Sequence, residues 1–165
     1  MQVRDNTIVE PSVAIFMNSS VTGNTLRSNL IWWAASGPAD GAVSYGATIP
    51  SALAGFVPAR VTSVDGTTVT GTSGEGSACA SCTVELFLDD ADGVVEALQS
   101  LAVVTASESG DWTANLSAPL AQGYGIRAMS TVPGSFTIPG LTAGTTSRLS
   151  GLYATFRIFL PLVSR

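Results

Sequence analysis

Residues 82–88 read Cys-Thr-Val-Glu-Leu-Phe-Leu, and the turn sequence Asp89-Asp90-Ala91-Asp92-Gly93 follows directly. Polar and apolar residues alternate through residues 82–88, as they do in a β-strand that buries one face. This alternation predicts that the side chain of Glu85 is exposed to solvent. The aspartates and the glycine end the strand, because these residue types favour turns.

Six further segments with strand character surround this one. Together the seven segments are residues 60–64, 67–72, 82–88, 97–105, 112–116, 124–130 and 145–149. Short strands at regular spacing with turns between them are typical of an antiparallel β-sandwich. Trp112 follows a turn, and we expect its ring to pack between the two sheets.

The same region resembles the bacterial immunoglobulin-like modules of large secreted proteins. The matching features are Cys79-Ala80-Ser81-Cys82 ahead of the strand, the Asp-rich turn, Gly110-Asp111-Trp112-Thr113, and Tyr124-Gly125-Ile126-Arg127-Ala128. The resemblance implies an Ig-like β-sandwich over residues 59–155 and a secreted or cell-surface location. The long segment 131–144 departs from the tight hairpin usual in such modules.

A repeat precedes the sandwich. Val3-Arg4-Asp5-Asn6-Thr7-Ile8 recurs 23 residues later as Leu26-Arg27-Ser28-Asn29-Leu30-Ile31. A period in the low twenties with Asn at turns suits one coil of a parallel β-helix, in which like residues stack and Asn side chains bond to each other. Residues 1–33 resemble the last coils of right-handed parallel β-helix surface proteins. The alternative is two unrelated strands of similar composition.

Two segments flank these units. Residues 34–58 are rich in Ala, Gly, Ser and Pro and predict a connecting segment. Residues 156–165 form an apolar tail with alternation before Pro161, which predicts a strand that completes its own sheet or inserts into a neighbour's sheet. The predicted assembly contacts are Trp32, Trp33, Phe156, Ile158, Phe159 and Leu160.

The composition excludes several kinds of chemistry. The chain has 165 residues, seven arginines, no lysine and no histidine, so it lacks a His-based catalytic relay and a Lys Schiff base. A net charge of -5 argues against nucleic acid, and no apolar run approaches the roughly 20 residues of a membrane span. Charged residues are 12% and mean hydropathy is +0.37, which favours a chain that buries surface in an assembly. The N-terminus does not read as a signal peptide, so we expect a mature or truncated product, with truncation favoured; the alternative is that Met1 is not the natural start.

Two groups of residues could form small sites. Cys79 and Cys82 precede an extended strand instead of opening a helix, so we expect a disulfide formed in an oxidising compartment. Asp89, Asp90 and Asp92 crowd three carboxylates into one turn, where their oxygens could bind Ca²⁺. The alternative is a solvated acidic turn without a metal ion.

The sequence therefore favours a non-catalytic extracellular structural module of a bacterial surface protein, with adhesion among its roles. A related hypothesis is a self-assembling filament subunit, with neighbouring copies joined by strand complementation. The alternative from another class is a carbohydrate-binding module or a fragment of a β-helix polysaccharide-processing enzyme. Trp32, Trp33 and Tyr45 would be its aromatic contacts.

Overall fold

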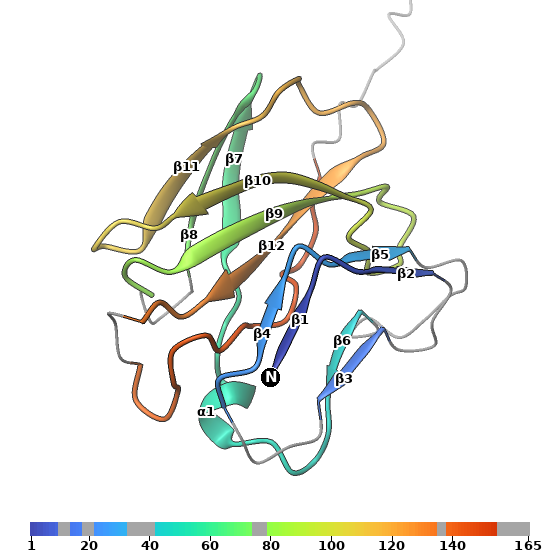
Figure 1. Ribbon diagram of the computed structural model, residues 1–165. Helices are drawn as coiled ribbons and strands as arrows, with labels where there is room; N and C mark the ends of the chain where they lie inside the picture. The colour runs from blue at the N-terminus through green and yellow to red at the C-terminus, as the bar shows by residue number, and fades with distance from the viewer. Residues whose placement is uncertain (10–13, 18–21, 33–41, 74–78, 135–137, 155–165) are drawn as a thin grey trace, which may run out of the picture.

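The computed structural model describes residues 1–9, 14–17, 22–32, 42–73, 79–134 and 138–154, and all statements below concern these residues. They form an all-β structure with one short helix (Figure 1). The strands are β1 (Gln2–Arg4), β2 (Thr7–Val9), β3 (Ile15–Met17), β4 (Thr25–Arg27), β5 (Leu30–Trp32), β6 (Val43–Tyr45), β7 (Arg60–Asp65), β8 (Thr68–Thr72), β9 (Thr83–Asp89), β10 (Gln99–Thr105), β11 (Asp111–Asn115), β12 (Gly125–Thr131) and β13 (Tyr153–Ala154). Helix α1 spans Ser51–Ala54.

The N-terminal strands follow the same path twice. Strands β1, β2 and β3 form a first coil, and β4, β5 and β6 form a second coil that pairs with it strand by strand in parallel. Val3 lies opposite Leu26 and Ile8 opposite Ile31, which is the 23-residue offset that the sequence repeat predicts. Strand β6 falls inside the segment 34–58 that the sequence suggested was a connector. Its register differs, because Ile15 lies opposite Val43 and the offset has grown to 28 residues.

Both coils turn a corner with the same backbone conformation. Asp5 has φ 55° and Ser28 has φ 53°, so the residue before each asparagine is left-handed. Asn6 donates from Nδ2 to Asn29 Oδ1 over 2.9 Å, and the backbone N–H of Asn6 donates to the same oxygen over 3.3 Å. The expected bond between stacked asparagines is therefore present.

Strands β7 to β13 form two antiparallel sheets. One has the order β11-β8-β7 and the other β10-β9-β12-β13. Six of the seven strands predicted from sequence are found near their expected positions. The seventh differs, because residues 145–149 contribute only an isolated bridge between Thr131 and Thr146, and the last strand is β13.

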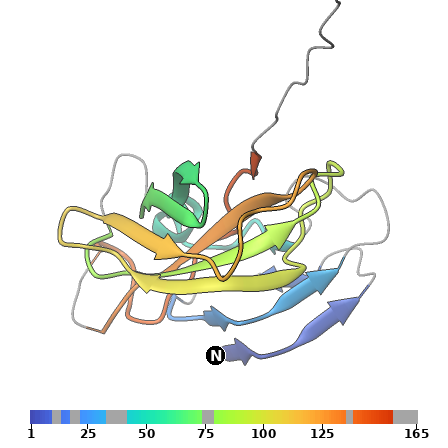
Figure 2. The same ribbon diagram turned by 90° about the horizontal axis from the view of Figure 1, so that it is seen from above.

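The four-stranded sheet is the central layer of the molecule. Its β9 and β12 are buried on both faces. One face packs against β7, β8 and β11 through a core that contains Leu86, Ile126 and Trp112, so Trp112 lies between the sheets as predicted. The other face packs Phe87 and Met129 against the two coils. Figure 2 shows the blue coils and the green strands β7 and β8 on opposite sides of this sheet.

Helix α1 belongs to a third, smaller core. Leu53 and Phe56 pack there with Cys79, Cys82, Val132 and Leu141. No helix in the described part of the chain has the length and apolar character needed to cross a membrane.

Candidate functional site

The contact between the second coil and the sandwich joins distant parts of the chain through backbone and side-chain hydrogen bonds. Ile31 and Ala97 exchange two backbone hydrogen bonds, of 2.9 and 3.0 Å. The N–H of Leu26 donates to Thr146 Oγ1 over 3.0 Å. These bonds satisfy the edge of the second coil that faces away from the first coil, as an additional strand would.

Residues 142–146 extend this contact along the start of β4. Gly23 donates its N–H to Thr145 Oγ1 over 2.8 Å, and Thr25 donates from Oγ1 to the carbonyl of Gly144 over 2.7 Å. Residues 142–146, which follow the long segment noted in the sequence, therefore reach the edge of the second coil. We refer to Glu85, Ala97 and residues 142–146 together as the cap.

Glu85 is the charged member of the cap, and its predicted exposure is wrong. Its side chain is 1% exposed, and its Oε2 lies 3.2 Å from Nε of Arg27 on the second coil. Its Oε1 accepts a 3.0 Å bond from the N–H of Ser28. Burial raises the pKa of the Glu85 carboxyl, while Arg27 and the Ser28 N–H oppose that rise. Alternation correctly predicted that Glu85 and Leu86 lie on different faces of β9. The face that carries Glu85 is covered by the coils and does not meet solvent.

The first coil has no equivalent cover among the described residues. Val3 and Ile8 are half-buried, whereas their partners in the second coil, Leu26 and Ile31, are each 1% exposed. Three of the large exposed apolar residues also belong to this region, namely Met1, Val9 and Phe16. The two coils therefore differ in how completely their edges are satisfied.

The three aspartates proposed as calcium ligands do not act as one group. Asp89 is fully buried and pairs with Arg127, whose guanidinium also donates to the carbonyls of Ser150 and Val94. Asp90 and Asp92 are exposed. They come together instead with Glu96, with carboxylate oxygens within 4.8 Å of one another. Burial raises the pKa of Asp90, and the nearby carboxylates add to this rise.

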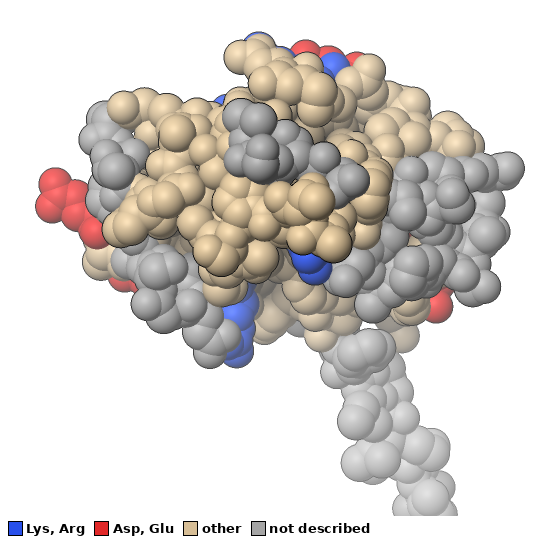
Figure 3. Space-filling view, turned by 90° about the horizontal axis from the view of Figure 1, so that it is seen from below, with Lys and Arg blue, Asp and Glu red and all other residues tan. Residues whose placement is uncertain are grey.

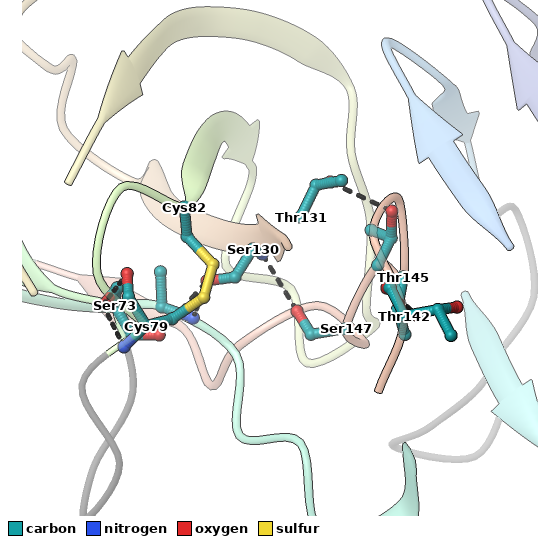
Figure 4. The surroundings of a disulfide bond; sticks show 10 residues. Ser73, Cys79, Cys82, Ser130, Thr131, Thr142, Thr145 and Ser147 are labelled. Carbon is teal, nitrogen blue, oxygen red and sulfur yellow. Dashed lines mark hydrogen bonds between the residues drawn. A yellow bond between two sulfur atoms is a disulfide. The ribbon is translucent and has the colours of Figure 1, made fainter. Parts of the chain in front are cut away.

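Cys79 and Cys82 form the disulfide expected from the sequence. Both are fully buried, and Ser73 accepts from the N–H of Cys79 through Oγ and donates to its carbonyl (Figure 4). The bond therefore staples the entry to β9 and lies in the small core beneath α1. Burial of both sulfurs fits a structural role and not an exchange role.

The aromatic residues proposed for sugar binding are not gathered on one described surface. Trp32 is 46% exposed and donates from Nε1 to the carbonyl of Leu98 over 3.1 Å. Tyr45 is instead half-buried, with the guanidinium of Arg148 4.2 Å from the centre of its ring. Burial raises the pKa of Tyr45 to about 12 against the opposing charge of Arg148. Trp33, Phe156, Ile158, Phe159 and Leu160 lie outside the described residues.

Two surface hollows are large enough to admit a small ligand. One of about 420 Å³ lies between residues 57–62 and 150–153, and one of about 210 Å³ lies between residues 99–101 and 116–121. Neither of these two hollows is lined by a carboxylate. On the face shown in Figure 3, the charged side chains of the described residues are scattered and form no patch of one sign.

Comparison with protein families, with curated proteins and with solved structures finds no match to this chain.

Proposed function

We propose that this chain is a non-catalytic structural module of an extracellular bacterial surface protein, in which an Ig-like β-sandwich closes the end of a short parallel β-helix. The observation that carries the proposal is the pairing of the second coil with the cap. A solenoid exposes unpaired N–H and C=O groups at its last coil, and covering that edge prevents association with other strands. Ile31 and Leu26 use such edge groups to bond Ala97 and Thr146.

The buried disulfide supports an extracellular location, and the low content of charged residues supports a place within a larger assembly. Disulfides persist in oxidising compartments, and Cys79 and Cys82 are paired within a core where they stabilise the structure. Only 12% of the residues are charged, which suits a module that is held within a larger assembly.

Closure by the cap also bears on filament formation. Head-to-tail stacking of coils from separate copies needs an unpaired edge on both the first and the second coil. In the described residues the edge of the second coil is hydrogen-bonded to the sandwich. The coils therefore support a terminal module better than a repeating filament subunit. Strand donation by Phe156, Ile158, Phe159 and Leu160 is a separate hypothesis.

Tryptophan reporters test whether the sandwich and the coils form one closed unit. In Trp112→Phe the fluorescence comes from Trp33 and from Trp32 on β5, whereas Trp32→Phe/Trp33→Phe leaves only Trp112 in the sandwich. In each variant, fluorescence and far-UV circular dichroism should give the same denaturant midpoint. Loss of the coil signal well before the circular dichroism transition would contradict closure of the coils by the sandwich.

The exposed ring of Trp32 supports a second candidate, a carbohydrate-binding module. Affinity electrophoresis through gels that contain soluble polysaccharides separates the two functions. A structural module migrates at the same rate in gels with and without polysaccharide. Retardation that is lost in Trp32→Ala and kept in Trp112→Phe would favour carbohydrate binding instead.

A further inference from the structure

The two stacked asparagines, Asn29 and Asn6, make different hydrogen bonds. Asn29 donates from Nδ2 to the carbonyl of Val3 over 2.8 Å, and its Oδ1 accepts from Asn6. Asn6 occupies the same corner one coil earlier, but its Nδ2 donates to the carbonyl of Arg4, two residues away on its own coil. No hydrogen bond to Asn6 Oδ1 is present among the described residues. In the part of the chain that the structure describes, the asparagine stack therefore ends at Asn6, whose Oδ1 accepts no bond there.

Several backbone groups of the first coil also point away from the second coil. The N–H of Asp5 donates to the carbonyl of Arg27, that of Ile15 to Ala42, and the carbonyl of Asn6 accepts from Leu30. Because backbone groups alternate in direction along a strand, Arg4, Thr7 and Phe16 direct their N–H and C=O groups away from the second coil. The Arg4 carbonyl accepts from Asn6 Nδ2. The Arg4 N–H and the groups of Thr7 and Phe16 have no backbone partner among the described residues and form an open edge, which we call the free edge.

Side-chain burial also indicates that the first coil is uncovered on one side. Val3 and Ile8 point into the stack like Leu26 and Ile31, yet they are only half-buried. The second coil is covered on one side by the first coil and on the other side by the cap. One missing layer on the first coil accounts for the difference.

A second copy of this chain is a poor occupant of the free edge. Its second coil is covered by its own Glu85, Ala97 and Thr146. It could offer only the same first-coil edge, where the Asn6 Oδ1 acceptor would meet an identical acceptor. The complementary surface is a coil that brings an Asn-type N–H and Nδ2 to Asn6, as Asn6 itself does for Asn29.

We infer that the free edge of the first coil docks one more parallel coil of the same 23-residue repeat, which enters directly ahead of β1 and stacks its asparagine on Asn6. This inference rests on the proposed function, because it treats the chain as the closed end of a longer solenoid. The added coil would cover Val3 and Ile8 and pair with the N–H of Arg4 and the backbone groups of Thr7 and Phe16.

The test supplies that coil from the chain's own sequence. A copy of residues 2–24 is inserted after Met1, so that each copied residue lies 23 positions before its original. Amide exchange at Arg4, Thr7 and Phe16 should slow by at least about tenfold relative to the original chain, and the protein should stay in the same oligomeric state. The matched control carries the same residues in scrambled order and should leave these amides unchanged.

A third variant tests the asparagine contact. In this variant the copy of Asn6 is replaced with alanine. Amide exchange at Thr7 should then be roughly fivefold faster than in the extended chain, as expected for one lost hydrogen bond. Unchanged exchange in the extended chain would overturn the inference, as would equal protection by the scrambled insert. If Leu26 and Ile31 are protected in the original chain while the extended chain gains nothing, the docking inference alone fails. If Leu26 and Ile31 are unprotected from the start, the proposed function itself fails.

Discussion

Arg27 on the second coil and Glu85 on the central sheet form an ion pair across the junction of the two parts of the chain, with 3.2 Å between Nε and Oε2. Glu85 is 1% exposed, so its charge is taken out of water and balanced by Arg27 and by the N–H of Ser28. The pair fixes the corner of the second coil against β9.

Stability should depend on pH through Glu85 in a definite direction. Burial raises the pKa of its carboxyl in the folded state, so the folded chain holds this proton to higher pH than the unfolded chain does. This contribution to stability is complete below the ordinary Glu pKa of about 4.3 and is lost as pH rises through the raised value. The free energy of unfolding of the natural chain, minus that of Glu85→Gln, should therefore fall from about pH 4 to pH 7.

Arg27→Ala provides the control for this pH effect. Without the guanidinium the pKa of Glu85 should rise further, and the fall in stability with pH should become larger. Urea unfolding at several pH values measures all three proteins. A difference between the natural chain and Glu85→Gln that is flat, or that grows with pH, would show that burial does not dominate the Glu85 environment.

Removing one partner of the buried pair of Asp89 and Arg127 should strongly lower the free energy of unfolding. Asp89→Ala leaves the guanidinium of Arg127 buried without its counter-ion and should cost about 3–5 kcal/mol. Asp89→Ala/Arg127→Met removes both charges and should cost less than the sum of the single changes. Asp65→Asn, on the exposed end of β7, should change stability by less than about 0.5 kcal/mol. A double-mutant cycle by chemical denaturation measures the coupling, and simple additivity would contradict it.

How far the sequence predicts this structure depends on how locally each feature is encoded. Alternation identified six strands of the sandwich, and the repeated asparagines identified the register between Val3 and Leu26, because both signals lie within short stretches. Strand β6 was missed because the offset changes to 28 residues and Val43-Ser44-Tyr45 carries no asparagine signature. Residues 145–149 were assigned to a strand, but Ser147 and Thr146 use their hydroxyls to bond Ser130 and Leu26 instead of continuing a ladder.

The site was less accessible from sequence than the strands. Alternation assumes that one face of a strand meets solvent, and β9 is buried on both faces because the coils cover the side that carries Glu85. Asp89 was grouped with its neighbours Asp90 and Asp92, since its partner Arg127 lies 38 residues away in sequence. Pairings between distant residues of this kind leave no local pattern.

The disulfide should stabilise the fold by a modest amount. It closes a loop with a sequence separation of 3, and chain entropy then predicts a loss of about 2 kcal/mol in Cys79→Ala/Cys82→Ala. Because both sulfurs are fully buried, a thiol reagent should detect no free thiol in the native chain and two only after unfolding and reduction. Reaction of the native, unreduced protein would contradict the pairing.

Gly71 should be intolerant of a side chain. A Cβ at this position would overlap the ring of Trp112 and the carbonyl of Arg60, so Gly71→Ala should cost about 1–3 kcal/mol and shift the emission of Trp112. Gly134→Ala is the matched control, since a Cβ there has no neighbour within 4 Å, and it should be nearly neutral. Equal stability of the two variants, measured by thermal unfolding, would contradict the packing of Trp112 on β8.

Native-state amide exchange at Leu26 and Ile31 tests closure of the second coil most directly. Their N–H groups point to Thr146 and Ala97 and have no other partner to protect them in the described structure. We predict that both amides exchange only through the same global opening that exposes Leu86 at the centre of β9. Fast exchange at Leu26 and Ile31 while Leu86 stays protected would contradict the account.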